Sequence, residues 1–137
     1  MTEEELKKRT KLFAVRIFNL VDTFPSKKAS QVIAYQILKS SSSVAANYRA
    51  VCRAKSDADF YNKLKIVDEE ADESLFWLEM ITDVNFLCDK NELQLLLKEA
   101  DELVSIFSAS IRTLRNKTNT GTRGSLNPKI LNPNIQK

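Results

Sequence analysis

The scarcity of glycine and proline constrains the fold more than any other feature of the sequence. The chain has 137 residues with only two glycines and three prolines, and Pro25 is the only one of these five before residue 121. Sheets need such residues at their turns, so the chain before residue 121 has almost no strand-and-turn signals. Hydrophobic residues make up 43% and charged residues 28%, which suits one soluble domain with a core. An all-α fold is predicted.

Four segments repeat apolar residues at helical spacing. Pro25 interrupts the first segment, and Ser26 is the predicted N-cap of a second helix that reaches about Ala54. Because the connections are short, an antiparallel up-down-up-down four-helix bundle is predicted over residues 1–117. The apolar stripes span Leu6–Phe24, Ile33–Val51, Phe60–Ile81 and Leu93–Leu114.

Two further helix starts carry capping signals. Ser56 with Asp59 and Asp89 with Glu92 have the spacing of a capping box, in which each side chain bonds the backbone of the other residue. After residue 117 the helical pattern stops, and a five-residue unit occurs twice, at Leu126–Ile130 and Leu131–Ile135. Residues 118–137 are therefore predicted to be a low-complexity, disordered tail.

The stretch KSSSSVAANYRA, Lys39 to Ala50, places serines and alanines on the predicted buried face of the second helix. Small side chains there allow two helix backbones to approach closely, and serine hydroxyls can bond the carbonyl one turn back. Asn47 is the polar exception. It either specifies the register of a packed seam or lies at the boundary of the stripe.

The opposite face of the second helix is basic. From Thr23 to Ser56 the chain has no acidic residue, and five side chains share a narrow arc of the helical wheel: Lys28, Tyr35, Lys39, Arg49 and Arg53. Cations interleaved with an aromatic ring are typical of a nucleic-acid surface. The alternatives are a solvated face or a partner for the acidic third helix.

The sequence lacks the residues that several classes of function need. The chain has no histidine, and two glycines cannot build a phosphate-binding loop. The cluster DEEADE has carboxylates without imidazoles, so no metal, cofactor or small-molecule substrate is predicted, and no enzyme activity. Cys52 and Cys88 lack metal-site spacing, and the N-terminus lacks a signal peptide. The longest uncharged run is about half of the ~20 residues that a membrane helix needs, so a cytoplasmic protein is predicted.

A long stretch of the sequence resembles a known family. The segment ILKSSSSVAANYRAVCRAKSDADFYNKLKIVDEEADESLFWLEMI, Ile37 to Ile81, is similar to the signature of the 23S rRNA-intervening sequence proteins, also called four helix bundle proteins. It departs from that signature at Ser41 and Ala45, where the family often has glycine, and at Ala50, where it often has glutamate.

The resemblance implies an antiparallel four-helix bundle that self-associates, with ring-shaped pentamers among relatives. Such proteins are encoded in intervening sequences of bacterial 23S rRNA genes, and a distant branch assists reverse transcriptases. A subunit interface is expected at the matched polar and apolar residues beside the third stripe, where Glu70 meets Arg49 or Lys63 of a neighbour. Trp77 either belongs to that interface or widens the core. The expected interface residues are Asn47, Lys63, Ile66, Glu70, Glu73 and Trp77.

The preferred hypothesis is a non-enzymatic homo-oligomer, expected to be a pentameric ring, that presents its basic second-helix faces to rRNA or another nucleic acid. Assembly would multiply weak contacts through effective concentration. The alternative is a protein-interaction or scaffold module, such as an accessory subunit of a polymerase, that binds no nucleic acid.

Overall fold

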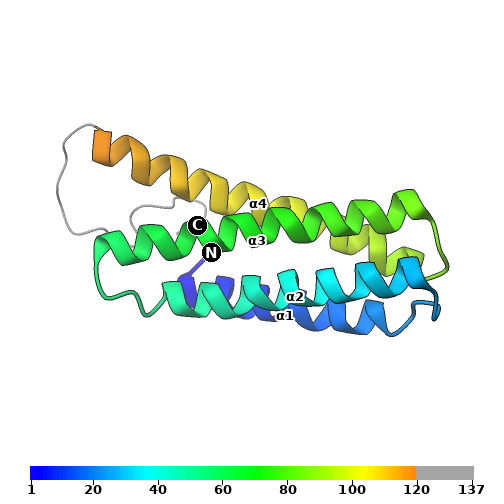
Figure 1. Ribbon diagram of the computed structural model, residues 1–137. Coiled ribbons are helices and arrows are strands. Elements are labelled where there is room, and N and C mark those ends of the chain that lie inside the picture. Colours follow the sequence, from blue (N-terminus) through cyan, green and yellow to red (C-terminus); the bar gives the residue numbers. More distant parts are fainter. Residues whose placement is uncertain (120–137) are drawn as a thin grey trace.

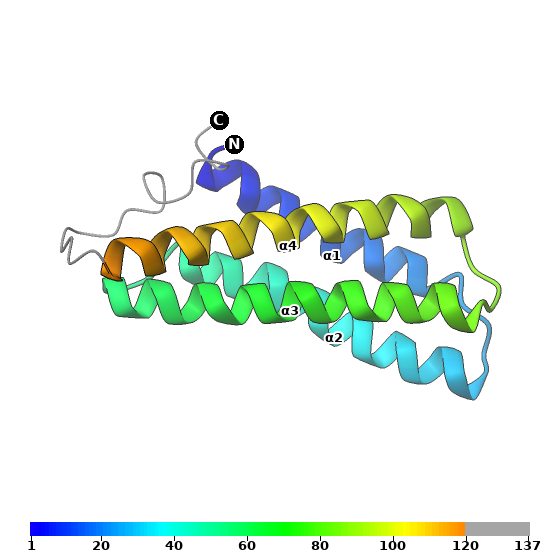
Figure 2. The same cartoon turned by 90° about the horizontal axis from the view of Figure 1, so that it is seen from above.

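The computed structural model describes residues 1–119, which form four α-helices and no strand. Each helix reverses the direction of the one before it, so the predicted up-down-up-down bundle is confirmed (Figure 1). Seen from above, α3 and α4 run side by side over the pair formed by α1 and α2 (Figure 2). The predicted tail lies outside the described residues, except that residues 118 and 119 belong to α4. The helices are α1 (Glu3–Val21), α2 (Lys28–Val51), α3 (Asp57–Val84) and α4 (Lys90–Asn119).

The predicted N-cap of α2 was wrong by one residue and its predicted end by three. Lys27, not Ser26, is the N-cap, because the backbone nitrogen of Lys27 donates to the Ser30 hydroxyl at 3.2 Å and fixes the first turn there. At the other end α2 stops at Val51. The backbone nitrogen of Arg53 donates to the carbonyl of Ala50, three residues back, so the chain tightens into a turn.

The predicted caps of α3 and α4 are confirmed, but their reciprocal bonds are not. Ser56 and Asp89 accept hydrogen bonds from the backbone three residues on, each at 3.1 Å. The Asp59 carboxylate accepts from the nitrogen of Lys55 rather than from that of Ser56. The backbone nitrogen of Asp89 instead donates to the Thr23 hydroxyl at 3.0 Å, which ties the α3–α4 connection to the end of α1.

The four predicted stripes meet in one core, and the buried serines belong to it. Ser40 and Ser41 of α2 are buried, as the sequence predicted. The Ser74 hydroxyl of α3 donates to that of Ser40 at 3.0 Å, so the small residues of α2 do bring a second helix close. Two turns farther along α2, the ring of Tyr48 lies 5.8 Å from that of Phe107 on α4. No helix within residues 1–119 has the length and apolarity to cross a membrane.

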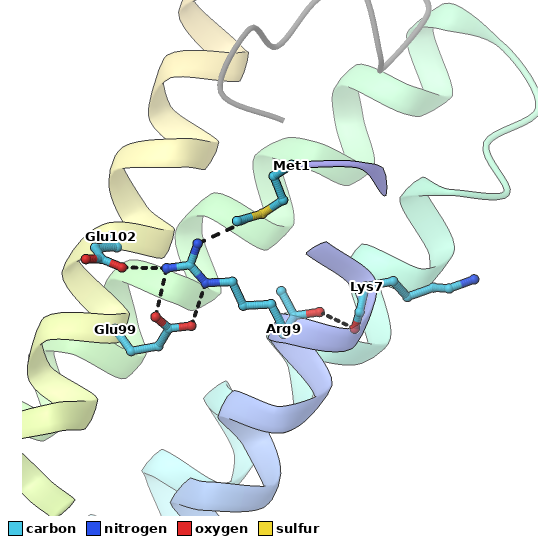
Figure 3. A network of polar contacts seen from close by, with 6 residues as sticks. Met1, Lys7, Arg9, Glu99 and Glu102 are labelled. Carbon is cyan, nitrogen blue, oxygen red and sulfur yellow. Dashed lines mark hydrogen bonds and ion pairs between the residues drawn. The ribbon is translucent and has the colours of Figure 1, made fainter. Parts of the chain in front are cut away.

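Charged clamps close the seam between α1 and α4. The Arg9 guanidinium binds both carboxylate oxygens of Glu99, at 2.7 and 2.8 Å, and a carboxylate oxygen of Glu102 at 2.6 Å (Figure 3). Burial of the paired groups is partial, and hydrogen bonding to Glu99 raises the pKa of Arg9. Arg16 binds Glu92 in the same two-pronged way, so Glu92 serves this seam instead of its own helix cap.

Replacing Arg9 with methionine is expected to lower the free energy of unfolding by about 1 kcal/mol, because Glu99 loses a bidentate partner and Glu102 a single hydrogen bond while the aliphatic stem is kept. Urea unfolding measures the change. Lys8→Met on the same helix is the control, because Lys8 is exposed and none of the described acidic side chains pairs with it. Equal midpoints for the two variants would show that the clamp contributes nothing.

Candidate nucleic-acid interface

An open groove of about 730 Å³ runs between α1 and α2. Its floor is apolar or small, and its rim is cationic. We call this feature the α1/α2 groove. The floor comprises Ala14, Val15, Phe18, Ala45 and Ala46, and the rim carries Lys7, Lys8, Lys11 and Arg49, with Glu4, Asn19 and Ser42 completing the lining.

Helix geometry explains why these side chains gather. Residues three and four apart share a helix face, so Lys11 projects on the same side of α1 as Lys7 and Lys8. The two arginines of α1 project on the other side, where they pair with carboxylates of α4. On α2 the facing residues are small, so the wall of the groove stays low. The basic residues of α1 are thus divided between a structural seam and an open surface.

The rim keeps most of its positive charge. Lys7 pairs with Glu4 at 2.9 Å, and this exposed hydrogen bond raises the pKa of Lys7 and lowers that of Glu4. Over the described part of the chain, no acidic side chain forms an ion pair with Lys8, Lys11 or Arg49. A groove with several unneutralised cations attracts polyanions.

The predicted basic residues of α2 lie on its outer face. Lys28, Lys39 and Arg49 are exposed, and Tyr35 has 64% of its surface accessible. From Lys28 to Arg49 the helix rises about 31 Å at the usual spacing. Arg53 is also exposed, but it lies past the end of α2, so its predicted place on the same helical face was wrong.

The sequence interpretation missed the lysines of α1. Their segment also contains glutamates and arginines, so its charges looked balanced along the chain. Only the pairing of Arg9 and Arg16 with α4 reveals which cations stay free of carboxylates. The spacing of the basic residues around the α1 helix was the available signal, because the lysines and the arginines point to different sides. We define the basic surface as Lys7, Lys8, Lys11, Lys28, Tyr35, Lys39 and Arg49.

The predicted interface residues are divided between internal and outward positions. Asn47 is half-buried, and its amide donates to the Ser43 carbonyl in the same helix at 2.8 Å. Lys63 pairs with Asp59 one turn earlier at 2.6 Å. Burial raises the pKa of Glu70, repulsion from Glu73 adds to the shift, and a hydrogen bond to Ser43 opposes it. These polar groups therefore have partners within their own chain.

The outward part of the predicted interface is apolar and acidic. Ile66 is 44% exposed and Glu73 is exposed. Trp77 is half-buried against the core, and its ring nitrogen donates to the Glu73 carboxylate at 3.4 Å. Trp77 therefore packs against the core of its own chain, and its place in a subunit interface stays a prediction. Its ring also meets Phe76 edge to face, with centroids 4.9 Å apart.

The cysteines are partly buried thiols. Burial, with nearby Glu3, raises the pKa of Cys52 to about 12, and burial raises that of Cys88. Both thiols stay protonated at neutral pH and are poor nucleophiles. Across residues 1–119 there is no group of three or more acidic or cysteine side chains that could hold a metal ion.

Comparisons with known proteins place the chain in context. A family profile described as 23S rRNA-intervening sequence protein matches residues 2–109. A crystal structure of a protein with unknown function from the S23 ribosomal protein family of Bacteroides thetaiotaomicron is similar, with 32% sequence identity and a TM-score of 0.69. The similarity covers 77% of this chain and 97% of that one. Comparison with curated proteins gave no match.

Proposed function

The chain belongs to the 23S rRNA-intervening sequence protein family, and from its basic surface we propose that it binds structured RNA or another nucleic acid without acting as an enzyme. The observation that carries the proposal is the cationic rim of the α1/α2 groove. Lys8, Lys11 and Arg49 meet there from two helices, and no carboxylate in residues 1–119 pairs with them.

Phosphate contacts supply most of the affinity in such an interaction, because each neutralised phosphate releases a counterion. The rim of the groove would hold one stretch of backbone, and Lys39 and Lys28 would follow the same strand along the outer face of α2. A helix face about 31 Å long spans roughly nine phosphates at the spacing of one strand. This arrangement favours affinity over sequence specificity, since backbone contacts carry no base information.

Changing Lys8 and Lys11 together to glutamine is expected to weaken RNA binding about tenfold at low salt and to reduce the slope of log K against log salt by about 2. Fluorescence anisotropy across a salt series measures both quantities. The control is Lys98→Gln with Arg112→Gln, which removes the same charge from exposed sites on α4. This control should change the affinity and the salt slope only as much as the loss of net charge requires.

Equal losses in the two double variants would mean that RNA responds to net charge and not to the α1/α2 rim. Circular dichroism should be unchanged in both, because all four side chains are exposed. The test therefore separates a localised surface from general attraction.

The second candidate function is protein association. It is favoured by the outer face of α3, where Ile66 is 44% and Phe76 is 49% exposed beside acidic residues. Exposed apolar side chains rimmed by polar ones are found at protein interfaces. We propose that this face joins copies of the chain into a homo-oligomer, for which a pentameric ring is the expected form. Native mass spectrometry with and without RNA tests both candidates, and a monomer that still binds RNA would remove assembly from the account.

A further inference from the structure

We propose that the α1/α2 groove takes unpaired nucleotides, with one base stacked on the ring of Phe18 and its phosphates on the lysine rim. The inference rests on the proposed function and deepens it, because it names the form of nucleic acid that this groove selects. A surface that contacted phosphates alone would need only the rim, whereas the groove also has an apolar floor with an exposed aromatic ring.

Phe18 is the central residue of this proposal. Its side chain lines the groove, 46% of it is exposed, and it has no aromatic partner in the part of the chain that the structure describes. The other exposed phenylalanine, Phe76, packs edge to face against Trp77. An unpartnered ring inside a cationic groove offers a π-face to a base, and every base can use it.

The rest of the floor leaves room for a flat ligand. Ala45 and Ala46 present only methyl groups on α2, and Ala14 does the same on α1. The groove of about 730 Å³ lies within the ~300–1,000 Å³ that small-molecule sites usually have. Bulkier residues at the alanine positions would fill the space in which a ring could lie parallel to Phe18.

Polar groups at the edge suit the base and the sugar. Asn19 is exposed in the lining, and its amide can donate to and accept from a base edge. The Ser42 hydroxyl donates to the Lys39 carbonyl at 3.1 Å, which leaves its oxygen free to accept from a ribose hydroxyl. A cation rim, an aromatic ring and an amide are together the groups that recognise unpaired nucleotides.

Two alternatives fit the groove less well. A duplex covers the faces of its bases, so it could use the rim but not Phe18. The acidic and apolar α3 face of a second copy could enter the groove, but Lys8 and Lys11 of the rim are exposed, and a strongly hydrated lysine ammonium suits phosphate more than a tightly packed helix. Both alternatives are outcomes of the test.

The test compares a short single-stranded RNA that carries 2-aminopurine with a blunt duplex of the same length, each titrated with the full chain. Phe18→Leu keeps an apolar side chain but removes the ring. It is expected to weaken single-strand binding about tenfold, to leave the salt slope unchanged and to leave duplex binding unchanged. Binding to the unaltered protein should quench the 2-aminopurine fluorescence, and the variant should not quench it.

Leu95→Ala is the control, because Leu95 is 58% exposed but lies on α4, outside the groove and outside the α3 face. It should bind both RNAs as the unaltered protein does. Circular dichroism should show both variants folded, since each side chain is about half exposed.

The outcomes separate this inference from the function on which it rests. Failure of the unaltered protein to bind either RNA at low salt would overturn both. Equal binding of single strand and duplex, with Phe18→Leu indistinguishable from the unaltered protein, would overturn the inference and leave the proposed function standing. A Phe18→Leu variant that changes the oligomer mass but not RNA affinity would assign the groove to a second copy and would likewise overturn it.

Discussion

Replacing Phe107 with alanine is expected to lower the free energy of unfolding by about 3–5 kcal/mol. Phe107 is fully buried on α4 and faces Tyr48 of α2, with ring centroids 5.8 Å apart. Removing the ring loses the free energy gained when the ring is buried away from water. It also leaves a cavity between α2 and α4, which cannot close easily because each of these helices also packs against α1 and α3. Urea unfolding should show a lower midpoint with an unchanged slope.

The control is Phe76→Ala, which removes the same ring from a half-exposed position on α3. It should cost much less, because little cavity forms at the surface. If both variants lost the same stability, Phe107 would not be packed in the core as described above.

Replacing Ser40 with leucine is expected to cost about 1–3 kcal/mol, the second largest effect in this set. Ser40 and Ser74 are both buried, and their hydroxyl oxygens are 3.0 Å apart across α2 and α3. A leucine side chain has no space at such a contact, so the helices must move apart or the side chain must adopt a strained rotamer. A lower urea midpoint measures the cost.

Ser40→Ala distinguishes packing from hydrogen bonding at the same position. The Ser74 hydroxyl also lies 2.9 Å from the Glu70 carbonyl and can donate its single proton there, so it stays satisfied when Ser40 loses its oxygen. Alanine should therefore be tolerated within about 1 kcal/mol. An alanine variant as unstable as the leucine variant would show that the hydroxyl, and not the small volume, is what this position requires.

Most of the fold could be predicted because the apolar spacing and the capping residues of each helix indicate the same structure as the packing of the four helices does. The stripe from Phe60 to Ile81 is buried as its spacing predicts, and Ser56 caps α3. The ends of α2 were less predictable. Ser30 and not Ser26 fixes its start, because a side chain inside the first turn competes with the expected cap. No local signal marks its end at Val51, where the chain tightens into a turn without glycine.

The candidate site could be predicted only in part. The cations of α2 stand out because their segment has no acidic residue, but those of α1 follow three glutamates in the same segment. Which α1 cations are neutralised depends on Glu92 and Glu99 of α4, far away in sequence. The groove likewise depends on two helices at once, since Phe18 comes from α1 and Ala45 from α2. Such contacts depend on the tertiary structure, so they cannot be predicted from residue spacing within one helix.

The central claim is that the basic surface binds nucleic acid, and one titration tests it most directly. The full-length protein is titrated into labelled structured rRNA fragments across a series of salt concentrations. We expect saturable binding whose logarithm falls linearly and steeply with the logarithm of the salt concentration, because several phosphates are neutralised at once. Absence of binding at the lowest salt concentration would contradict the claim and would make protein association the function to pursue.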